Sequence, residues 1–174
     1  MRMRAEGTSQ IVVRMGTLAD KAIIGGFLDA MFPHDPNRLT DAEFSSLATG
    51  GPLTVLVADI ESDVCGFIVL RDRGARPWTS IDFIGVAPHA VRKGVGKALM
   101  YAAITQAPRP ILRLFVHASN AAARALYATM GFRHTSTKPS HYQNGEDAIV
   151  MMRWLGPRWL RGHQKQTSRR GSTT

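Results

Sequence analysis

One stretch of this sequence has the residue types and spacing of an anion-binding site. An apolar segment from Ile84 ends at Pro88, and a basic, glycine-spaced turn then leads into an amphipathic segment. This order predicts a strand, a loop and a helix start, where the first backbone N–H groups lack intrahelical partners and the macrodipole favours an anion. Gly94 and Gly96 have no Cβ, so the backbone can approach an anion closely. Positive charge comes from Arg92, Lys93 and Lys97.

Two well-known phosphate motifs do not fit this turn. The dinucleotide fingerprint requires a third glycine that is missing here. The P-loop requires a longer spacing between its glycines and a hydroxyl after its lysine, whereas Ala98 follows Lys97. Taken alone, the turn also fits a helix start whose basic side chains are simply solvated. The phosphate interpretation therefore depends on what the rest of the chain supplies.

A second group of candidate functional residues follows a strand-like segment that ends at His117. Asn120 suits the start of a helix, with its amide available for an N-cap or a ligand, and Gly131 suits the helix end. Helical spacing places four side chains on one face: Ala123, Leu126, Tyr127 and Met130. Without further context, these features also describe a capped amphipathic helix with a tyrosine in the core.

The elements around both groups alternate between strands and helices, without internal repeats. The expected strands are residues 11–15, 53–59, 64–71, 79–87 and 111–117, with two more flanking Asn144 and Gly145. The expected helices run from Thr17 to Met31, from Thr40 to the Gly50-Gly51-Pro52 break, from the basic turn to about Thr105, and from Asn120 to Met130. This order predicts an α/β fold with a single central mixed β-sheet of about seven strands and helices on both faces.

Length and composition favour one globular domain. The chain has 174 residues, of which 44% are hydrophobic and 20% charged, and no apolar run approaches the length of a membrane span. Its polar N-terminus lacks a signal-peptide core, and its single cysteine, Cys65, fits a reducing cytoplasm. We expect a flexible N-terminus over residues 1–9, a domain over residues 10–156 and a basic, disordered tail over residues 157–174.

The positive charge of the chain is concentrated in its tail. The formal net charge is +9, and five cations after Pro157 account for more than half of it: Arg158, Arg161, Lys165, Arg169 and Arg170. Such a tail can attract nucleic acid, but a solvated terminus is the simpler interpretation. The body shows no basic stripe interleaved with aromatic residues. We therefore do not expect nucleic acid or a membrane as a partner.

Together, the two groups resemble the GNAT superfamily of acyl-CoA-dependent N-acyltransferases. There, a strand, a glycine-spaced pyrophosphate loop and a helix precede another strand and the pattern N-x-x-A-x-x-L-Y-x-x-x-G-F. Residues Asn120 to Phe132 match that pattern at every stated position. The resemblance implies a GNAT fold with acetyl-CoA as co-substrate, an amine acceptor and direct transfer in a ternary complex. By analogy, it also raises a homodimer as an alternative to a monomer.

The resemblance also implies roles for individual residues. The main chain around Gly85, at Ile84 and Val86, would pair with the pantetheine arm, and an N–H near Val86 would polarise the thioester carbonyl. The pyrophosphate would lie on the amides of Arg92, Lys93, Gly94, Val95, Gly96 and Lys97. Asn120 and Ala123 would contact the thiol end of the cofactor. Tyr127 would act as general acid toward the departing thiolate, because a phenol with a pKa of about 10 is protonated at neutral pH.

The segment from His141 to Met151 narrows the resemblance. It is similar to the Y-x-x-G-E-D-A-x-x-M ending of bacterial ribosomal-protein N-terminal alanine acetyltransferases. Two positions depart from the family pattern. Val91 stands where Arg or Gln is usual in the loop, and Phe115 stands where the alanine acetyltransferases have an acidic general base. Val91 implies that one phosphate contact is lost or replaced, although backbone amides should preserve binding. Phe115 cannot take a proton, which argues against simple transfer of N-terminal peptide specificity.

A different proton acceptor is therefore needed if the amine arrives as ammonium. Asp82, His117 and Glu146 are the candidates, although each also fits a solvated or structurally hydrogen-bonded side chain. The resemblance places the loop of His34 and Asp35 in the acceptor cleft. The six histidines show no metal-ligand spacing, so no metal is expected. The acceptor could be a small amine, an antibiotic, a peptide N-terminus or a lysine.

Two interpretations other than an enzyme stay open. The absence of an acid at position 115 is compatible with a catalytically weak CoA-binding regulatory module, whereas the presence of Tyr127 favours catalysis. The basic tail is compatible with a nucleic-acid interaction protein, whose binding should weaken with salt and disappear when the tail is removed. Acetyl-CoA binding and turnover across an amine panel would separate these alternatives.

Overall fold

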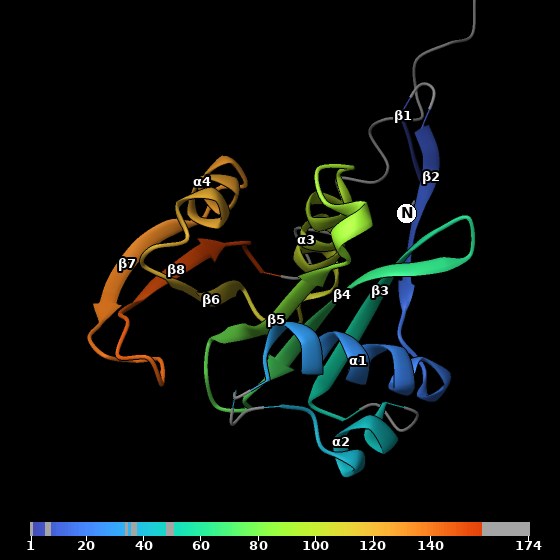
Figure 1. Cartoon of the computed structure of the whole chain (residues 1–174). Helices are drawn as coiled ribbons and strands as arrows, with labels where there is room; N and C mark the ends of the chain where they lie inside the picture. The colour runs from blue at the N-terminus through green and yellow to red at the C-terminus, as the bar shows by residue number, and fades with distance from the viewer. Residues whose placement is uncertain (1, 6–7, 34, 36–37, 48–50, 158–174) are drawn as a thin grey trace, which may run out of the picture.

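The computed structural model describes residues 2–5, 8–33, 35, 38–47 and 51–157 (Figure 1). The strands are β1 (Arg2–Ala5), β2 (Thr8–Met15), β3 (Leu53–Ile60), β4 (Asp63–Asp72), β5 (Trp78–Val86), β6 (Ile111–His117), β7 (Arg133–Lys138) and β8 (Ala148–Trp154). The helices are α1 (Lys21–Met31), α2 (Asp41–Ser46), α3 (Val95–Gln106) and α4 (Ala121–Thr129), with 3-10 turns η1 (Leu18–Asp20) and η2 (Pro88–Ala90).

All strands belong to one eight-stranded sheet in the order β1-β2-β3-β4-β5-β6-β8-β7. Only β5 and β6 are parallel among the described strands, so the sheet is mixed, as the sequence predicts. The additional strand is β1, which pairs antiparallel with β2 in a region predicted as a flexible N-terminus. Residues 1 and 6–7, and residues 158–174 of the predicted tail, lie outside the described residues.

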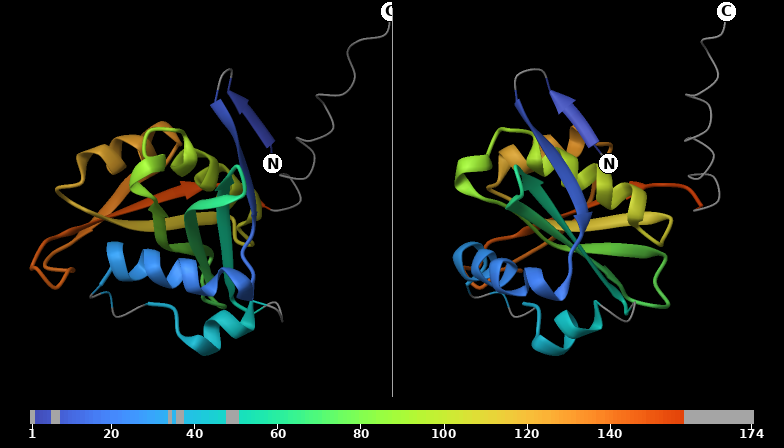
Figure 2. Two further views of the ribbon diagram at one scale, coloured as in Figure 1. Left: turned by 45° about the vertical axis from the view of Figure 1, so that its right-hand side comes forward. Right: turned by 90° about the vertical axis from the view of Figure 1, so that its right-hand side faces the viewer.

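Helices cover both faces of the sheet, which confirms the predicted α/β class (Figure 2). On one face, Ile24 and Leu28 of α1 and Phe44 of α2 pack against β3, β4 and β5. On the other face, α3 and α4 share a larger core with β3 to β6 and β8. The residues of β6 alternate between intermediate and full burial. Leu112, Leu114 and Val116 enter the larger core, whereas Arg113, Phe115 and His117 face the opposite side.

The parallel pair β5 and β6 separates part of the way along its length. Pairing joins Trp78–Ile81 to Ile111–Leu114 and stops there, so the last residues of β5 have no neighbour on that side (Figure 1). The pairing of β4 with β5 shifts between Val69, which opposes Phe83, and Leu70, which opposes Ile81. Asp82 is therefore the extra residue of a β-bulge, and bulges bend and twist strands. This separation leaves an unpaired edge on the last residues of β5.

An ion-pair cluster fixes the start of α1 to the sheet. Arg14 of β2 contacts Asp20 with two nitrogens, at 2.8 and 2.9 Å, and Asp59 of β3 at 2.7 Å. The Arg14 hydrogen bonds and those of Thr17 lower the pKa of Asp20 to about 2. At the start of α2, Thr40 and Glu43 form the predicted capping box. Within the described residues, no helix is long and apolar enough to cross a membrane.

Candidate active site

The unpaired edge of β5 presents main-chain groups to the gap between β5 and β6. The Ala87 N–H donates to the Cys65 carbonyl at 2.8 Å, so Ala87 faces β4. Strand alternation then turns the N–H and C=O groups of Ile84 and Val86 away from β4, toward the gap. The same alternation turns the main chain of Gly85 toward β4. A Cβ on Gly85 would lie 2.6 Å from Phe67 Cε1 and 2.7 Å from Met31 Sδ, so packing against α1 requires glycine there.

The basic turn forms the N-terminus of α3. Arg92 and Gly94 have positive φ angles of 65° and 89°, and Gly94 is the N-cap residue without any side-chain cap. The first intrahelical bond joins the Ala98 N–H to the Gly94 carbonyl at 3.0 Å. The N–H groups of residues 95–97 consequently lack intrahelical acceptors. A Cβ on Gly96 would lie 3.7 Å from Val86 Cγ2, so this helix start lies directly against the end of β5.

Helix α4 contributes a buried phenol. Its N-cap is Asn120, whose Oδ1 accepts the Ala123 N–H at 3.0 Å. Tyr127 is 7% exposed and packs beside Phe132, with ring centroids 6.0 Å apart. This burial raises the pKa of Tyr127 to about 12. Within the part of the chain that the structure describes, the Tyr127 hydroxyl has no hydrogen-bond partner.

A histidine–glutamate pair lies at the end of β6. His117 Nδ1 is 2.9 Å from Glu146 Oε2, and the other oxygen of Glu146 accepts the Ser119 N–H at 2.8 Å. The hydrogen bonds from Ser119, and then that from His117, lower the pKa of Glu146 to about 2. Glu146 is therefore a fixed carboxylate at neutral pH that accepts from Nδ1–H, a bond that leaves Nε2 of His117 as the proton-accepting nitrogen.

Tyr142 connects His117 to the other parts of the site. Its ring stacks on the His117 ring with centroids 3.4 Å apart and planes 12° apart. Burial raises the pKa of Tyr142 to about 12, and the charges of Asp35, Glu146 and Tyr127 contribute. The loop between β7 and β8 therefore meets the end of β6 at this ring. Asp35 is close enough for its charge to act on Tyr142, whereas His34 is outside the described residues.

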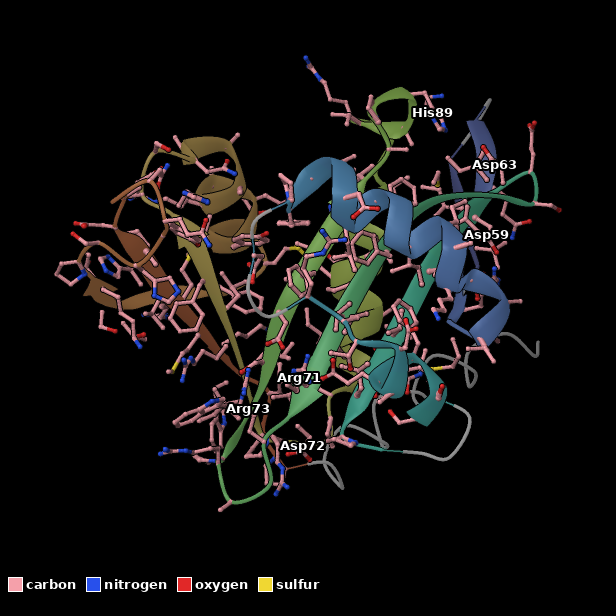
Figure 3. All side chains as sticks on the ribbon, turned by 60° about the horizontal axis from the view of Figure 1, so that its bottom comes forward. Asp59, Asp63, Arg71, Asp72, Arg73 and His89 are labelled. Carbon is pink, nitrogen blue, oxygen red and sulfur yellow. The ribbon has the colours of Figure 1, made fainter. Side chains whose placement is uncertain are left out.

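Asp82 is held in a different network. Its Oδ2 accepts from Arg71 Nε at 2.5 Å and lies 3.7 Å from Arg73 Nη2. Arg71 also bonds Glu43 of α2, so Asp82 belongs to a cluster that joins β4, β5 and α2. Arg71 and Arg73 lie at the opposite end of the sheet from His89 of the basic turn (Figure 3). His117 therefore lies at the end of β6 and Tyr127 on α4, the helix that follows it, whereas Asp82 is engaged by guanidinium groups.

Three strands assemble a row of cations and aromatic rings that sequence reasoning missed. Arg113 Cζ lies 5.0 Å from the Trp78 ring centroid and 4.5 Å from that of Phe115. Arg76 Cζ lies over Trp78 at 5.5 Å, and Lys138 Nζ lies over Phe115 at 5.3 Å. The only sequence signal was the alternation of residues 113, 115 and 117 on β6, because the other members are distant in the chain.

Two further features bear on the choice of site. A cavity of about 620 Å³ lies near the C-terminal end of α3, with Thr54, Leu70, Asp72, Thr79 and Pro108 among its lining residues. None of the motif residues lines it, so shape alone would have indicated the wrong place. Among the described residues, no three His, Cys, Asp or Glu side chains are grouped so that they could hold a metal ion.

The fold and the two motifs together define an acetyltransferase site. Over residues 23–132, the sequence matches the Acetyltransferase (GNAT) family, and the chain belongs to this family. The 5-NmdU N-acetyltransferase of Pseudomonas phage PaMx11 is 32% identical over 111 residues, covering 64% of this chain and 76% of the relative. The ribosomal protein bS18-alanine N-acetyltransferase of Escherichia coli K12 is 39% identical over 74 residues, covering 39% of this chain and 50% of the relative.

Solved structures show the same fold. The Escherichia coli ribosomal-protein-S18-alanine N-acetyltransferase has a TM-score of 0.69 at 23% identity, covering 84% of this chain and 94% of that one. The protein yncA from Salmonella typhimurium, solved with its cofactor acetyl-CoA, has a TM-score of 0.71 at 22% identity, covering 83% of this chain and 94% of that one. Family membership makes this chain a GNAT N-acetyltransferase, and acetyl-CoA is the acyl donor of the family.

The residues present fit acetyl-CoA. Free helix N-terminal amides suit a pyrophosphate, and the open edge of β5 offers strand-like pairing to an extended, amide-containing arm. The Tyr127 hydroxyl has no hydrogen-bond partner among the described residues.

Proposed function

We propose that this enzyme acetylates a primary amine by direct attack of the amine on the thioester. His117 accepts the proton of the amine, and the Tyr127 hydroxyl donates a hydrogen bond to the leaving sulfur. The observation that carries the proposal is the gap between β5 and β6. His117 ends β6, one strand of the parallel pair, and Tyr127 is carried on α4, the helix that follows β6. In this proposal both side chains act at the gap. Acetyl-CoA supplies an activated acetyl thioester whose carbonyl carbon accepts the amine.

The chain would hold the donor with main-chain groups. Ile84 and Val86 would pair with the pantetheine arm, and the amides of residues 92–97 would surround the pyrophosphate. Asn120 Oδ1 is used as a cap, which leaves the amide NH₂ for the thiol end of the cofactor. Ala123 lies one turn further along α4. Val91 is 54% exposed beside this loop, at the position where the family usually has Arg or Gln. The backbone amides would still bind the pyrophosphate without a charged side chain there.

His117 is better suited than Asp82 to accept the proton of the amine. Glu146 fixes the imidazole through Nδ1, and a buried or fixed partner of this kind orients a histidine base in acyl transfer. Asp82 already accepts a charge-assisted hydrogen bond from Arg71, so protonating it would break that pair. Phe115 has no acid–base chemistry and lies two residues from His117, on the same face of β6.

Tyr127 would stabilise the leaving sulfur. A phenol with a pKa of about 12 stays protonated at any physiological pH, so it can donate a hydrogen bond as charge develops on the thiolate. Cys65 is no route to an acyl-enzyme. Its thiol is fully buried, donates to the Ala58 carbonyl at 3.2 Å and has a pKa raised by burial. Direct attack within a ternary complex is therefore the pathway proposed here.

The proposal is tested by measuring acetylated amine and free CoA across an amine panel with wild type, His117→Gln, Glu146→Gln and Asp82→Asn. Loss of a general base costs about 10²–10⁴-fold in rate. We expect the loss of kcat in His117→Gln to lie in that range and the loss in Glu146→Gln to be about tenfold. Asp82→Asn should change the free energy of unfolding more than it changes kcat. Full activity of His117→Gln together with loss in Asp82→Asn would reverse the assignment of the base.

The same assay separates the enzyme from the regulatory module. Acetyl-CoA binding without turnover of any amine would favour the regulatory alternative. Acetyl transfer to the protein itself in the absence of amine would contradict direct attack, and intact-mass spectrometry detects it. A nucleic-acid function of the tail predicts salt-sensitive binding that a chain ending at Gly156 loses.

A further inference from the structure

The row formed by Arg76, Trp78, Arg113, Phe115 and Lys138 carries charge that the described residues leave unpaired. Arg113 Nε is buried without a hydrogen-bond partner. Across the residues placed by the structure, no carboxylate lies within ion-pair distance of the three cations of this row, Arg76, Arg113 and Lys138. We name this set the cation–aromatic row.

Neighbouring charges do not neutralise the row. Arg71 and Arg73 lie nearby, and the carboxylates of this cluster, Asp82 and Glu43, are engaged by Arg71. The charges that act on Arg113 are those of Arg73, Arg76 and Asp82, and Asp82 is already bonded to Arg71. Desolvation, followed by the charges of Arg73 and Arg76, lowers the pKa of Arg113. A partly buried guanidinium without an anion is costly, and the contacts with Trp78 and Phe115 offset only part of that cost.

The row lies on the same face as the proposed base. Arg113, Phe115 and His117 occupy alternate positions of β6 and face away from the larger core. Arg113 and His117 are four residues apart, which corresponds to roughly 13 Å along the strand. The last residue pair that joins β5 to β6 is Ile81 with Leu114, and the two strands separate beyond it. Arg113 precedes Leu114, so the row begins where the strands are still paired.

We propose that the acceptor is an amine whose scaffold carries an oxyanion, phosphate or carboxylate, which binds Arg113 and Arg76 while the amine reaches His117. This inference rests on the proposed function and specifies its substrate class. A guanidinium fork binds two oxygens of one oxyanion, so both the charge and the buried Nε would gain a partner. Phe115 then serves as an apolar spacer between the oxyanion and the base, which explains an aromatic side chain there.

The separation of the two groups predicts a length requirement. An oxyanion at Arg113 and an amine at His117 cannot belong to a very short molecule, because about 13 Å separates the two backbone positions and the arginine side chain spans only part of it. Acceptors with a short spacer should gain nothing from the oxyanion. Acceptors with a spacer of about 6–10 Å should gain most.

The test uses three series of amines with increasing alkyl chain length: α,ω-aminoalkyl phosphates, ω-amino carboxylic acids and uncharged amino alcohols. For the longer phosphates or carboxylates, we expect kcat/KM to be about 10–100-fold above that of the matched alcohol, because one or two charge-assisted hydrogen bonds contribute that much binding. The comparison of phosphates with carboxylates identifies which oxyanion the row selects. Calorimetry with a long aminoalkyl phosphate and CoA-bound enzyme gives a readout independent of turnover.

The variants are Arg113→Gln and the exposed Arg76→Gln, which keeps the test valid if the first variant is unstable. Both should lower kcat/KM for the anionic acceptors and leave the amino alcohols unchanged. The matched control is Lys21→Gln, which removes the same charge from the Lys21–Asp41 ion pair on α1 and should change neither series.

Two results would overturn the inference. Equal kcat/KM values for anionic and uncharged amines in the wild type would show that the cation–aromatic row does not bind an oxyanion of the acceptor. An equal loss on both series in Arg76→Gln and Arg113→Gln would show a structural role only. If no amine of any series were acetylated, the proposed function itself would fail, which is a different outcome from acetylation without preference.

Discussion

Replacing Tyr127 by Phe separates catalysis from stability in this fold. The substitution removes one hydroxyl from a side chain that is 7% exposed and leaves the ring in the core. That hydroxyl has no hydrogen-bond partner among the described residues. Removing it therefore breaks no internal bond, and the free energy of unfolding should change by less than about 0.5 kcal/mol.

The effect on the rate should be much larger. Loss of one donor toward a charge that develops in the transition state costs about 10²–10³-fold in kcat, or about 3–4 kcal/mol. Acetyl-CoA affinity should change by less than about threefold, because the proposed contact strengthens only as the sulfur becomes charged. With a pKa of about 12, Tyr127 should impose no loss of rate below about pH 10.

The assay measures CoA release under saturating acetyl-CoA, with urea unfolding of the same preparations. The matched control is Tyr101→Phe on α3, where the ring lies 5.8 Å from Lys97 Nζ. That variant should retain kcat. Tyr127→Phe with full activity would refute the role of the hydroxyl. A loss of stability above about 2 kcal/mol with a matching loss of activity would assign Tyr127 a structural role instead.

Three other substitutions test the supports of the site. Asp20→Asn should lose about 2 kcal/mol of stability at pH 7, because the pKa of Asp20 is lowered from 3.8 to about 2. In urea titrations, the stability difference between the variant and the wild type should persist above pH 4 and vanish as the pH falls toward 2. Gly85→Ala should lower the free energy of unfolding by about 1–3 kcal/mol, because its Cβ would lie 2.6 Å from Phe67 Cε1, and an unchanged urea midpoint would contradict that packing. Gly94→Ala should cost about 1 kcal/mol at φ 89° and weaken acetyl-CoA binding in calorimetry, whereas unaltered affinity would place the pyrophosphate elsewhere.

The sequence predicted the parts of the site that depend on local pattern. The turn before α3 and the helix from Asn120 could be placed because glycine spacing, a capping residue and helical periodicity are local signals. Strand β6 was predicted with the bounds that the structure has. The alternation that separates Leu114 from Phe115 could also be anticipated from its sequence.

Long-range pairing was beyond the reach of local pattern. Whether Asp82 faces solvent or a guanidinium depends on a β-bulge and on Arg71, eleven residues away. The cation–aromatic row joins Trp78, Arg113 and Lys138 from three strands, so a search for basic and aromatic residues close in sequence could not find it. Strand β1 was missed because Arg2–Ala5 has only four residues, too few for its alternation of polar and apolar residues to identify a strand.

A crystal structure with acetyl-CoA tests the central claim most directly. The account predicts the pantetheine arm paired with the main chain of Ile84 and Val86, the pyrophosphate on the amides of residues 92–97, and the sulfur within hydrogen-bond distance of Tyr127 Oη. It also predicts an open path from the thioester to His117 Nε2. A thioester bound away from the gap between β5 and β6, or a sulfur out of reach of Tyr127, would contradict it.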